Sequence, residues 1–263
     1  MINIYIILTT SANLVVGMVN LLSVGQAAFY GIGAYVTSLA LIVLGLPLFP
    51  SILLSMLVTA FLGFVIGIIS LRLKGDYFVL ATLGFQIIIY TILYNWISVT
   101  KGPYGIPGIP APEILGFIKI SGIYGFFILS LILMVFVIFV FFRLIHSPFG
   151  RALKGIRDDE TAMLALGRNT AQLKTQAFTI ACAFTAISGF LFASYITYID
   201  PTSFNLDESI FIVSAVLIGG TGNIKGPVMG AVFVVILPEL LRFVGLPDNI
   251  AANMRLIIYG FAL

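Results

Sequence analysis

Long, uninterrupted apolar runs constrain this chain more than any other feature of its sequence. The five longest contain no charged residue; they lie at 28–44, 51–71, 79–97, 122–142 and 175–198. A helix needs about 20 mostly apolar residues to cross about 30 Å of hydrocarbon, because each backbone N–H and C=O must be paired inside the helix there. The runs are continuously apolar rather than alternating, which favours helices over a transmembrane barrel. The sequence therefore predicts an all-α, polytopic transmembrane helical bundle.

Shorter apolar runs bring the expected number of spans to about nine, within a range of about eight to ten. They lie at 4–22, 209–219, 227–241 and 254–263. The run at 209–219 fits either a full span or a re-entrant half-helix. The first run follows no basic segment and has no small-residue cleavage site before Leu22, so we expect a retained span rather than a signal peptide. We expect residues 1–263 to form a single transmembrane domain.

Charged residues are few and unevenly placed. They make up 9% of the chain, against about a quarter of an ordinary soluble domain. The densest basic group lies in one loop between spans and comprises Arg143, Arg151, Lys154, Arg157, Arg168 and Lys174. By the positive-inside rule this loop is cytoplasmic, and alternation of the spans then places Arg72, Lys74 and Lys225 on the same side. A net charge of +3 indicates no nucleic-acid partner.

The spans lack the groups that catalysis, metal binding or ion coupling needs. Ion-coupled carriers and proton pumps place ionisable side chains at membrane depth, and the five longest runs have none. His146 is the only histidine and Cys182 the only cysteine, so we expect no metal site, no internal disulfide and no catalytic centre. A GxxxxGK[ST] phosphate loop is absent, so active transport requires energy from a partner. The glycine-rich segment at 219–227 predicts a short turn between helices.

The loop at 145–174 has the signals of two short helices. Ser147 followed by Pro148 predicts an N-cap and the first residue of the first helix. A second helix is expected at about 159–166, with Gly167 in the C′ position that needs a positive φ. Its start is marked by negative charge at the positive end of the helix dipole, from Asp158, Asp159 and Glu160.

The second helix has a small apolar face, formed in the prediction by Ala162, Met163 and Leu166. A short helix of this kind across the ends of the spans fits two roles. It is either a plain connection or a lever on which an associated motor domain pushes. The residues alone leave both interpretations open.

Small residues gather at 23–35, where they let helix backbones approach closely or let the chain break at the membrane edge. GxxxG pairs at Gly63 and Gly67, and at Gly226 and Gly230, predict close helix packing. Four polar residues are candidates to line a translocation pathway: Ser23, Gln26, Thr82 and Gln86. Hydrogen bonding between helices is an equal alternative for each of them.

Five blocks, in order along nearly the whole chain, together resemble one family. They read LSVGQAAFYGIGAY at 22–35, LRLKGDYF at 71–78 with ATLGF at 81–85, TKGPYGI at 100–106, SPFGRAL at 147–153 continuing to Gly167, and GGTGN at 219–223 followed by Gly226 and Pro227. The chain resembles the LivM-type permeases of branched-chain amino acid ABC importers. This resemblance implies a permease subunit of an ATP-driven importer for leucine, isoleucine and valine, multi-pass in the bacterial inner membrane. A urea or amide permease of the same architecture, or a stand-alone channel or carrier, is an alternative.

The resemblance also implies partners. They are a second, LivH-like permease that completes the pathway, two cytoplasmic ATPases that hydrolyse ATP, and a periplasmic or extracellular substrate-binding protein; the chain itself holds no cofactor. In this family the cytoplasmic loop carries a coupling helix that contacts the ATPases, and the positions that match it are Arg157, Asp159, Glu160, Ala162, Met163 and Gly167. Met163 stands where the pattern usually has alanine. Members extend past the apolar segment that ends at Leu263, so we expect further residues beyond it.

Overall fold

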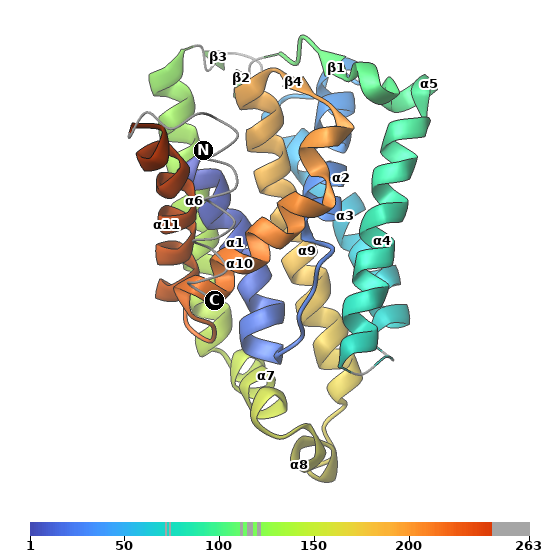
Figure 1. The fold of residues 1–263 in the computed structure, drawn as a ribbon, viewed down its shortest axis with the longest axis vertical. Coiled ribbons are helices and arrows are strands. Elements are labelled where there is room, and N and C mark those ends of the chain that lie inside the picture. The colour runs from blue at the N-terminus through green and yellow to red at the C-terminus, as the bar shows by residue number, and fades with distance from the viewer. Residues whose placement is uncertain (72, 74, 111–112, 115–117, 120–121, 244–263) are drawn as a thin grey trace.

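Helices dominate the computed structural model of this chain (Figure 1), which describes residues 1–243 except 72, 74, 111–112, 115–117 and 120–121. The apolar helices are α1 (Ile2–Val19), α2 (Gln26–Ile42), α3 (Leu48–Ser70), α4 (Asp76–Asn95), α6 (Ile123–His146), α9 (Thr170–Ile196), α10 (Leu206–Gly219) and α11 (Lys225–Phe243). The shorter helices are α5 (Ile97–Thr100), α7 (Pro148–Asp158) and α8 (Glu160–Ala165), with the 3-10 turns η1 (Gly102–Tyr104) and η2 (Pro201–Phe204). Two antiparallel pairs join β1 (Ile106–Pro107) to β4 (Tyr198–Ile199), and β2 (Glu113–Ile114) to β3 (Ile118–Lys119).

The apolar helices coincide with the apolar runs of the sequence. Eight of the nine runs are helical, and the ninth, at 254–263, lies outside the described residues. Six helical stretches are long and apolar enough to cross a membrane: α1, α3, α4, α6, α9 and the stretch Pro201–Gly219 that contains η2 and α10. The helices α2 and α11 are apolar but shorter. The predicted all-α polytopic bundle is confirmed.

The helices α1 and α9 form the centre of the bundle. In α1, 83% of the residues are buried, against 22% in an 18-residue stretch of α6. The helix α9 packs against α1, α2 and α3, and α1 also packs against α10 and α11. The outward faces of α3, α4 and α6 expose large apolar side chains such as Leu57, Ile88 and Phe136. So broad an apolar surface fits a hydrocarbon environment.

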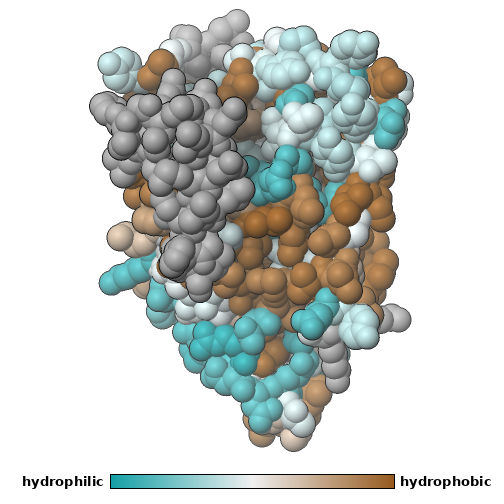
Figure 2. Space-filling model, in the orientation of Figure 1, coloured by the Kyte–Doolittle hydropathy of each residue, from teal (hydrophilic) through white to brown (hydrophobic). Residues whose placement is uncertain are grey.

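A hydrophobic band separates two more hydrophilic ends of the molecule on the face that Figure 2 shows. The loop with α7 and α8 projects at one end, and α5 and the β1–β4 pair lie at the other (Figure 1). The α7–α8 end carries basic residues of the predicted group: Arg151, Lys154, Arg157, Arg168 and Lys174. Lys225 begins α11 just after a turn that contacts Arg157, so it falls at the same end as predicted. Arg72 and Lys74 lie outside the described residues.

Glycines bring α2 and α9 into backbone contact. A Cβ atom on Gly33 would lie 2.6 Å from the Cα of Ala186, and one on Gly189 would lie 2.4 Å from the backbone nitrogen of Ala34. Distances this short leave no room for a side chain. The small residues at 23–35 therefore serve close packing of α2 on the central helix.

The GxxxG glycines also pack helices together. Gly63 on α3 faces the side chain of Cys182 on α9, where an added Cβ would come within 2.7 Å of the cysteine Cβ. Gly230 on α11 faces the carbonyl of Ala215 on α10, and Gly226 faces the end of the same helix. The lone cysteine is fully buried in this packing.

The helix α10 resolves the ambiguity of the run at 209–219. Its 14 residues span about 21 Å at 1.5 Å per residue, which is less than the hydrocarbon thickness. The turn η2 precedes it, and Figure 1 shows α10 inclined across the bundle. The run at 209–219 is therefore too short to span alone, and it spans together with η2, as the stretch Pro201–Gly219.

We expect Gly189→Ala to lower the thermal midpoint of the protein in detergent or nanodiscs. The added methyl group overpacks the α2–α9 contact, which costs about 1–3 kcal/mol. Gly84→Ala is the control, because a Cβ there has no neighbouring atom within 4 Å. An unchanged midpoint for Gly189→Ala would show that the two helices separate without penalty.

Candidate functional site

The chain leaves helical geometry between α1 and α2. The C-cap of α1 is Asn20, whose φ is +57°, and α2 begins only at Gln26. In Figure 1 the connecting stretch climbs from the lower end of α1 into the bundle, so that α2 starts inside it. Backbone outside a helix is tolerated at membrane depth only where its polar groups find partners within the protein.

Side chains from α4 and α10 pair the backbone N–H groups at this break. Three hydrogen bonds do so: Val24 N to Thr82 Oγ1 at 3.1 Å, Ala27 N to Ser209 Oγ at 2.9 Å, and Ala28 N to Gln86 Oε1 at 2.6 Å. The first N–H groups of a helix have no partner within the helix. Here the neighbouring helices supply the cap.

Gln86 is the centre of this hydrogen-bond network. Ser209 Oγ donates to Gln86 Oε1 at 3.1 Å, and Gln86 Nε2 donates to the carbonyl of Phe204 at 2.8 Å. One buried side chain therefore joins α2, α4, α10 and η2. Among the predicted pathway residues, Thr82 and Gln86 are thus engaged in the helix–helix bonding that was their alternative role. Ser209 was missed, because a serine early in an apolar run carries no sign of its partner.

Ser23 and Gln26 lie at the same break and are fully buried. Thr185 Oγ1 of α9 donates to Gln26 Oε1 at 3.4 Å. By contrast, Gln26 Nε2 and Ser23 Oγ have no hydrogen-bond partner among the residues that the structure describes. Buried polar groups without partners are costly. That these two side chains line a pathway remains a prediction.

The helix α7 joins the 145–174 loop to the bundle. Its N-cap is Ser147, whose Oγ accepts from Gly150 N at 3.3 Å, and Pro148 is its first residue, as predicted. It buries Leu153 and Ile156, and it packs against α1, α6 and α9. This amphipathic helix therefore lies fixed on the end of the bundle.

The helix α8 projects from the tip of the loop (Figure 1). Asp159, predicted to bring negative charge to the start of this helix, is its N-cap: its Oδ1 accepts from Thr161 N at 2.8 Å and from Ala162 N at 3.0 Å. Glu160 Oε1 forms an ion pair with Lys174 Nζ at 2.7 Å, which ties α8 to the start of α9. The N-terminal end of α8 is thereby held by side chains of the loop itself.

The C-terminal end of α8 follows the prediction, but its apolar face does not. Gly167 has φ +75°, and its N–H donates to the carbonyl of Leu164, as in a Schellman motif. Met163 turns inward, where its sulfur would lie 2.8 Å from a Cβ added to Gly155 of α7. The exposed apolar residues of the tip are Ala162, Leu164, Ala165 and Leu166. Met163 thus positions α8 on α7, and Leu164 takes its place on the exposed face.

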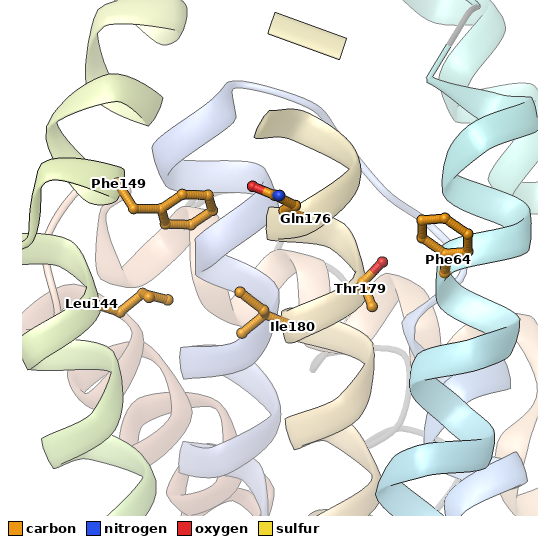
Figure 3. A pocket seen from close by; sticks show the side chains of 6 residues that line it. All are labelled: Phe64, Leu144, Phe149, Gln176, Thr179 and Ile180. Atoms are coloured by element: carbon orange, nitrogen blue, oxygen red, sulfur yellow. The ribbon is translucent and has the colours of Figure 1, made fainter. Parts of the chain in front are cut away.

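A groove near the α7 end is seen in Figure 3, lined by Phe64, Leu144, Phe149, Gln176, Thr179 and Ile180. Its volume is about 270 Å³. None of these side chains is charged, so the groove has nothing to pair the ammonium and carboxylate of an amino acid. Across the described residues there is also no group of three His, Cys, Asp or Glu side chains able to hold a metal ion.

Comparison with known families matches residues 1–263 to the family described as "Branched-chain amino acid transport system / permease component". The chain belongs to this family. Members of this permease family are named as transport components rather than enzymes. The permease is a multi-pass membrane protein, as its apolar helices indicate.

Three relatives are informative. The high-affinity branched-chain amino acid permease protein LivM of Salmonella typhimurium is 37% identical over 261 residues, which are 91% of this permease and 61% of the relative. The probable LivM of Methanocaldococcus jannaschii is 33% identical over 198 residues, 72% of this permease and 56% of the relative. The autoinducer 2 permease protein LsrC of Salmonella paratyphi B is 29% identical over 193 residues, 70% and 53% of the two chains. The permease spans about three fifths of the length of the first relative. No solved structure matches it.

We expect Gln86→Leu to destabilise the permease. The change leaves the N–H of Ala28 and the carbonyl of Phe204 without their partner, at about 1–3 kcal/mol for each buried group. Thermal unfolding in detergent measures the loss. Thr91→Val on the same helix is the control, because its exposed hydroxyl bonds only the carbonyl of Ile87 one turn earlier. Equal midpoints for the two variants would contradict the capping role.

We expect Asp159→Ala to fray α8. Loss of an N-cap acceptor costs about 1 kcal/mol, and α8 has only six residues to hold its shape. Limited proteolysis within 159–166 should become faster. Asp159→Asn keeps an acceptor oxygen and should stay resistant, whereas equal cleavage of both variants would argue that charge, not capping, orders the tip.

Proposed function

We propose that this permease is a transmembrane subunit of an ATP-driven importer for the branched-chain amino acids leucine, isoleucine and valine. It forms half of the translocation pathway and pairs with a second, LivH-like permease. Two cytoplasmic ATPases hydrolyse the ATP, and a periplasmic or extracellular binding protein delivers the substrate. The observation that carries this proposal is the family match along all of residues 1–263. The identity to LivM proteins supports the substrate class.

The proposal places the permease in the bacterial inner membrane with its α7–α8 end in the cytoplasm. That end carries the densest group of basic residues. Positive charge is retained on the cytoplasmic side of inner-membrane proteins. The 145–174 loop then faces the compartment in which ATP is available, as a coupling loop requires.

The tip α8 has the properties of a contact for the ATPases. Leu164 and Leu166 are 55% and 76% exposed, and α8 lies at the far end of a polar loop, beyond the hydrophobic band of Figure 2. Exposed apolar groups with a polar surround are typical of protein interfaces. Asp159 and Gly167 shape the helix, and Glu160 ties it to α9 through Lys174.

In this mechanism ATP-driven closure of the ATPases displaces the 145–174 loop, and the transmembrane helices alternate between outward-open and inward-open arrangements. The break before α2 is the place in the described bundle where backbone leaves helical geometry deep inside it. Ser23 and Gln26 are the pathway candidates there. In this proposal, specificity rests mainly with the binding protein.

The importer, assembled from the full-length chain and its partners in proteoliposomes, tests the proposal. Leucine uptake should require ATP and the binding protein, and isoleucine and valine should compete with it. Competition by urea alone would favour the urea or amide permease. Full-rate uptake by the permease alone, without ATP, would instead identify a channel or carrier.

We expect Leu166→Ser to weaken ATPase association. Burying part of a leucine side chain in an interface is worth about 1 kcal/mol, which is about fivefold in affinity. Copurification of the ATPases under increasing salt and detergent measures this. Leu44→Ser is the control. Leu44 is also strongly exposed, but it follows the C-terminal end of α2 and does not belong to the 145–174 loop. Equal association of the two variants would argue that the ATPases bind elsewhere.

A further inference from the structure

One face of α1 holds the glycine-rich turn that joins α10 to α11. Thr9, Asn13 and Gly17 are spaced by four residues, so they share that face. Thr9 Oγ1 donates to the carbonyl of Pro227 at 3.0 Å. Asn13 Nδ2 donates to the carbonyl of Asn223 at 2.9 Å. Polar side chains inside the bundle thus fix the turn to the end of α1.

Arg157 of α7 reaches the same place from the 145–174 loop. Its Nη1 donates to the carbonyl of Gly17 at 3.2 Å, in the last turn of α1. Carbonyls in that turn lack helical partners, and a cation there also meets the negative end of the dipole. Its Nε pairs with Asp158 at 3.3 Å, and 35% of the side chain is exposed. One N–H of the guanidinium is therefore directed at the end of α1, while the rest of the side chain stays partly exposed.

Because Gly222 has no side chain, the guanidinium of Arg157 can approach its backbone closely. Its φ is +91°, and a Cβ atom on it would lie 2.4 Å from Arg157 Nη1. The backbone N–H of Gly222 also faces Asn13 Oδ1 at 3.4 Å. Arginine, turn and α1 therefore meet at one point, and a side chain at 222 would push them apart.

The contacts on either side of this point form a continuous path. Toward the tip, Met163 of α8 packs on Gly155 of α7, two residues before Arg157. Toward the membrane, the turn leads into α10, whose Ser209 caps α2 and bonds Gln86. A displacement of α8 thus has a packed, hydrogen-bonded route to the break before α2.

We propose that Arg157 is a positioning residue that links movement of the 145–174 loop to the α10–α11 turn. Resting on the proposed function, this inference assigns Arg157 a partner inside the permease, the Gly17 carbonyl and the Gly222 turn, in place of a contact with the ATPase. Its removal separates ATP hydrolysis from transport without separating the subunits.

The test uses the assembled importer in nanodiscs and proteoliposomes with Arg157→Gln. Arg151→Gln is a matched control, because Arg151 lies on the same helix and donates to the carbonyl of His146 at the same 3.2 Å, but bridges only to the adjoining end of α6. Three quantities are measured: the amount of bound ATPase, the leucine transported per ATP hydrolysed, and hydrogen exchange in the segment 219–226.

For Arg157→Gln we expect full ATPase binding, faster exchange at 219–226, and a fall of about fivefold in leucine transported per ATP, the size of a typical coupling change. The control should change none of these. Loss of ATPase binding with unchanged exchange would overturn the inference and make Arg157 an ATPase contact. Unchanged transport per ATP would overturn it as well.

Gly222→Ala approaches the same link from the other side and covers the case in which Arg157→Gln assembles poorly. Gly222→Ala should also lower the amount of leucine transported per ATP. The double variant should be no more impaired than the more impaired of the two single variants, because both substitutions remove one shared contact. Additive losses would contradict the link. Hydrogen exchange is measured on the permease itself and does not depend on transport. Faster exchange at 219–226 in the variants, in an importer that takes up no amino acid, would therefore contradict the proposed function but not the link between Arg157 and the α10–α11 turn.

Discussion

The requirement that backbone polar groups be paired away from water governs this structure. Most of the chain meets it with continuous helices, whose hydrogen bonds are internal. The exception is the passage from α1 to α2, where Thr82, Gln86 and Ser209 supply the missing partners. Those three side chains come from α4 and α10, so the break can exist only while these helices stay in place. The arrangement of four elements is therefore tied to one irregular stretch.

Local signals in the sequence predicted a large part of this arrangement. Apolar runs located the helices because hydrocarbon imposes a minimum length on each of them. Ser147 located the start of α7 and Gly167 the end of α8, because caps depend only on neighbouring residues, and the acidic run at 158–160 located the start of α8. Such features are decided within a few residues, so no knowledge of the rest of the fold is needed.

What the sequence could not supply is contact across the bundle. Ser209 and Gln86 are 123 positions apart, and Arg157 and Gly17 are 140 apart. Neither pair has a spacing or a composition that distinguishes it from other polar residues. Met163 shows the same limit at short range, because its inward direction depends on how α8 folds back against Gly155. Long-range partners follow from topology, which hydropathy does not determine.

In the proposed mechanism, the central helix α9 would also act as a lever. Its 27 residues extend about 40 Å, about 10 Å more than the hydrocarbon is thick. Its closest contact with α2, at Gly189, divides it into an arm of about 28 Å toward the loop and one of about 10 Å beyond. Lys174 lies about 22 Å along the helix from that fulcrum, so rigid tilting would reduce a displacement at the Lys174–Glu160 pair to about one half at the far end, with a matching gain in force. In the proposed mechanism, the position of Gly189 would therefore set the mechanical advantage with which the loop acts on the opposite end of the bundle.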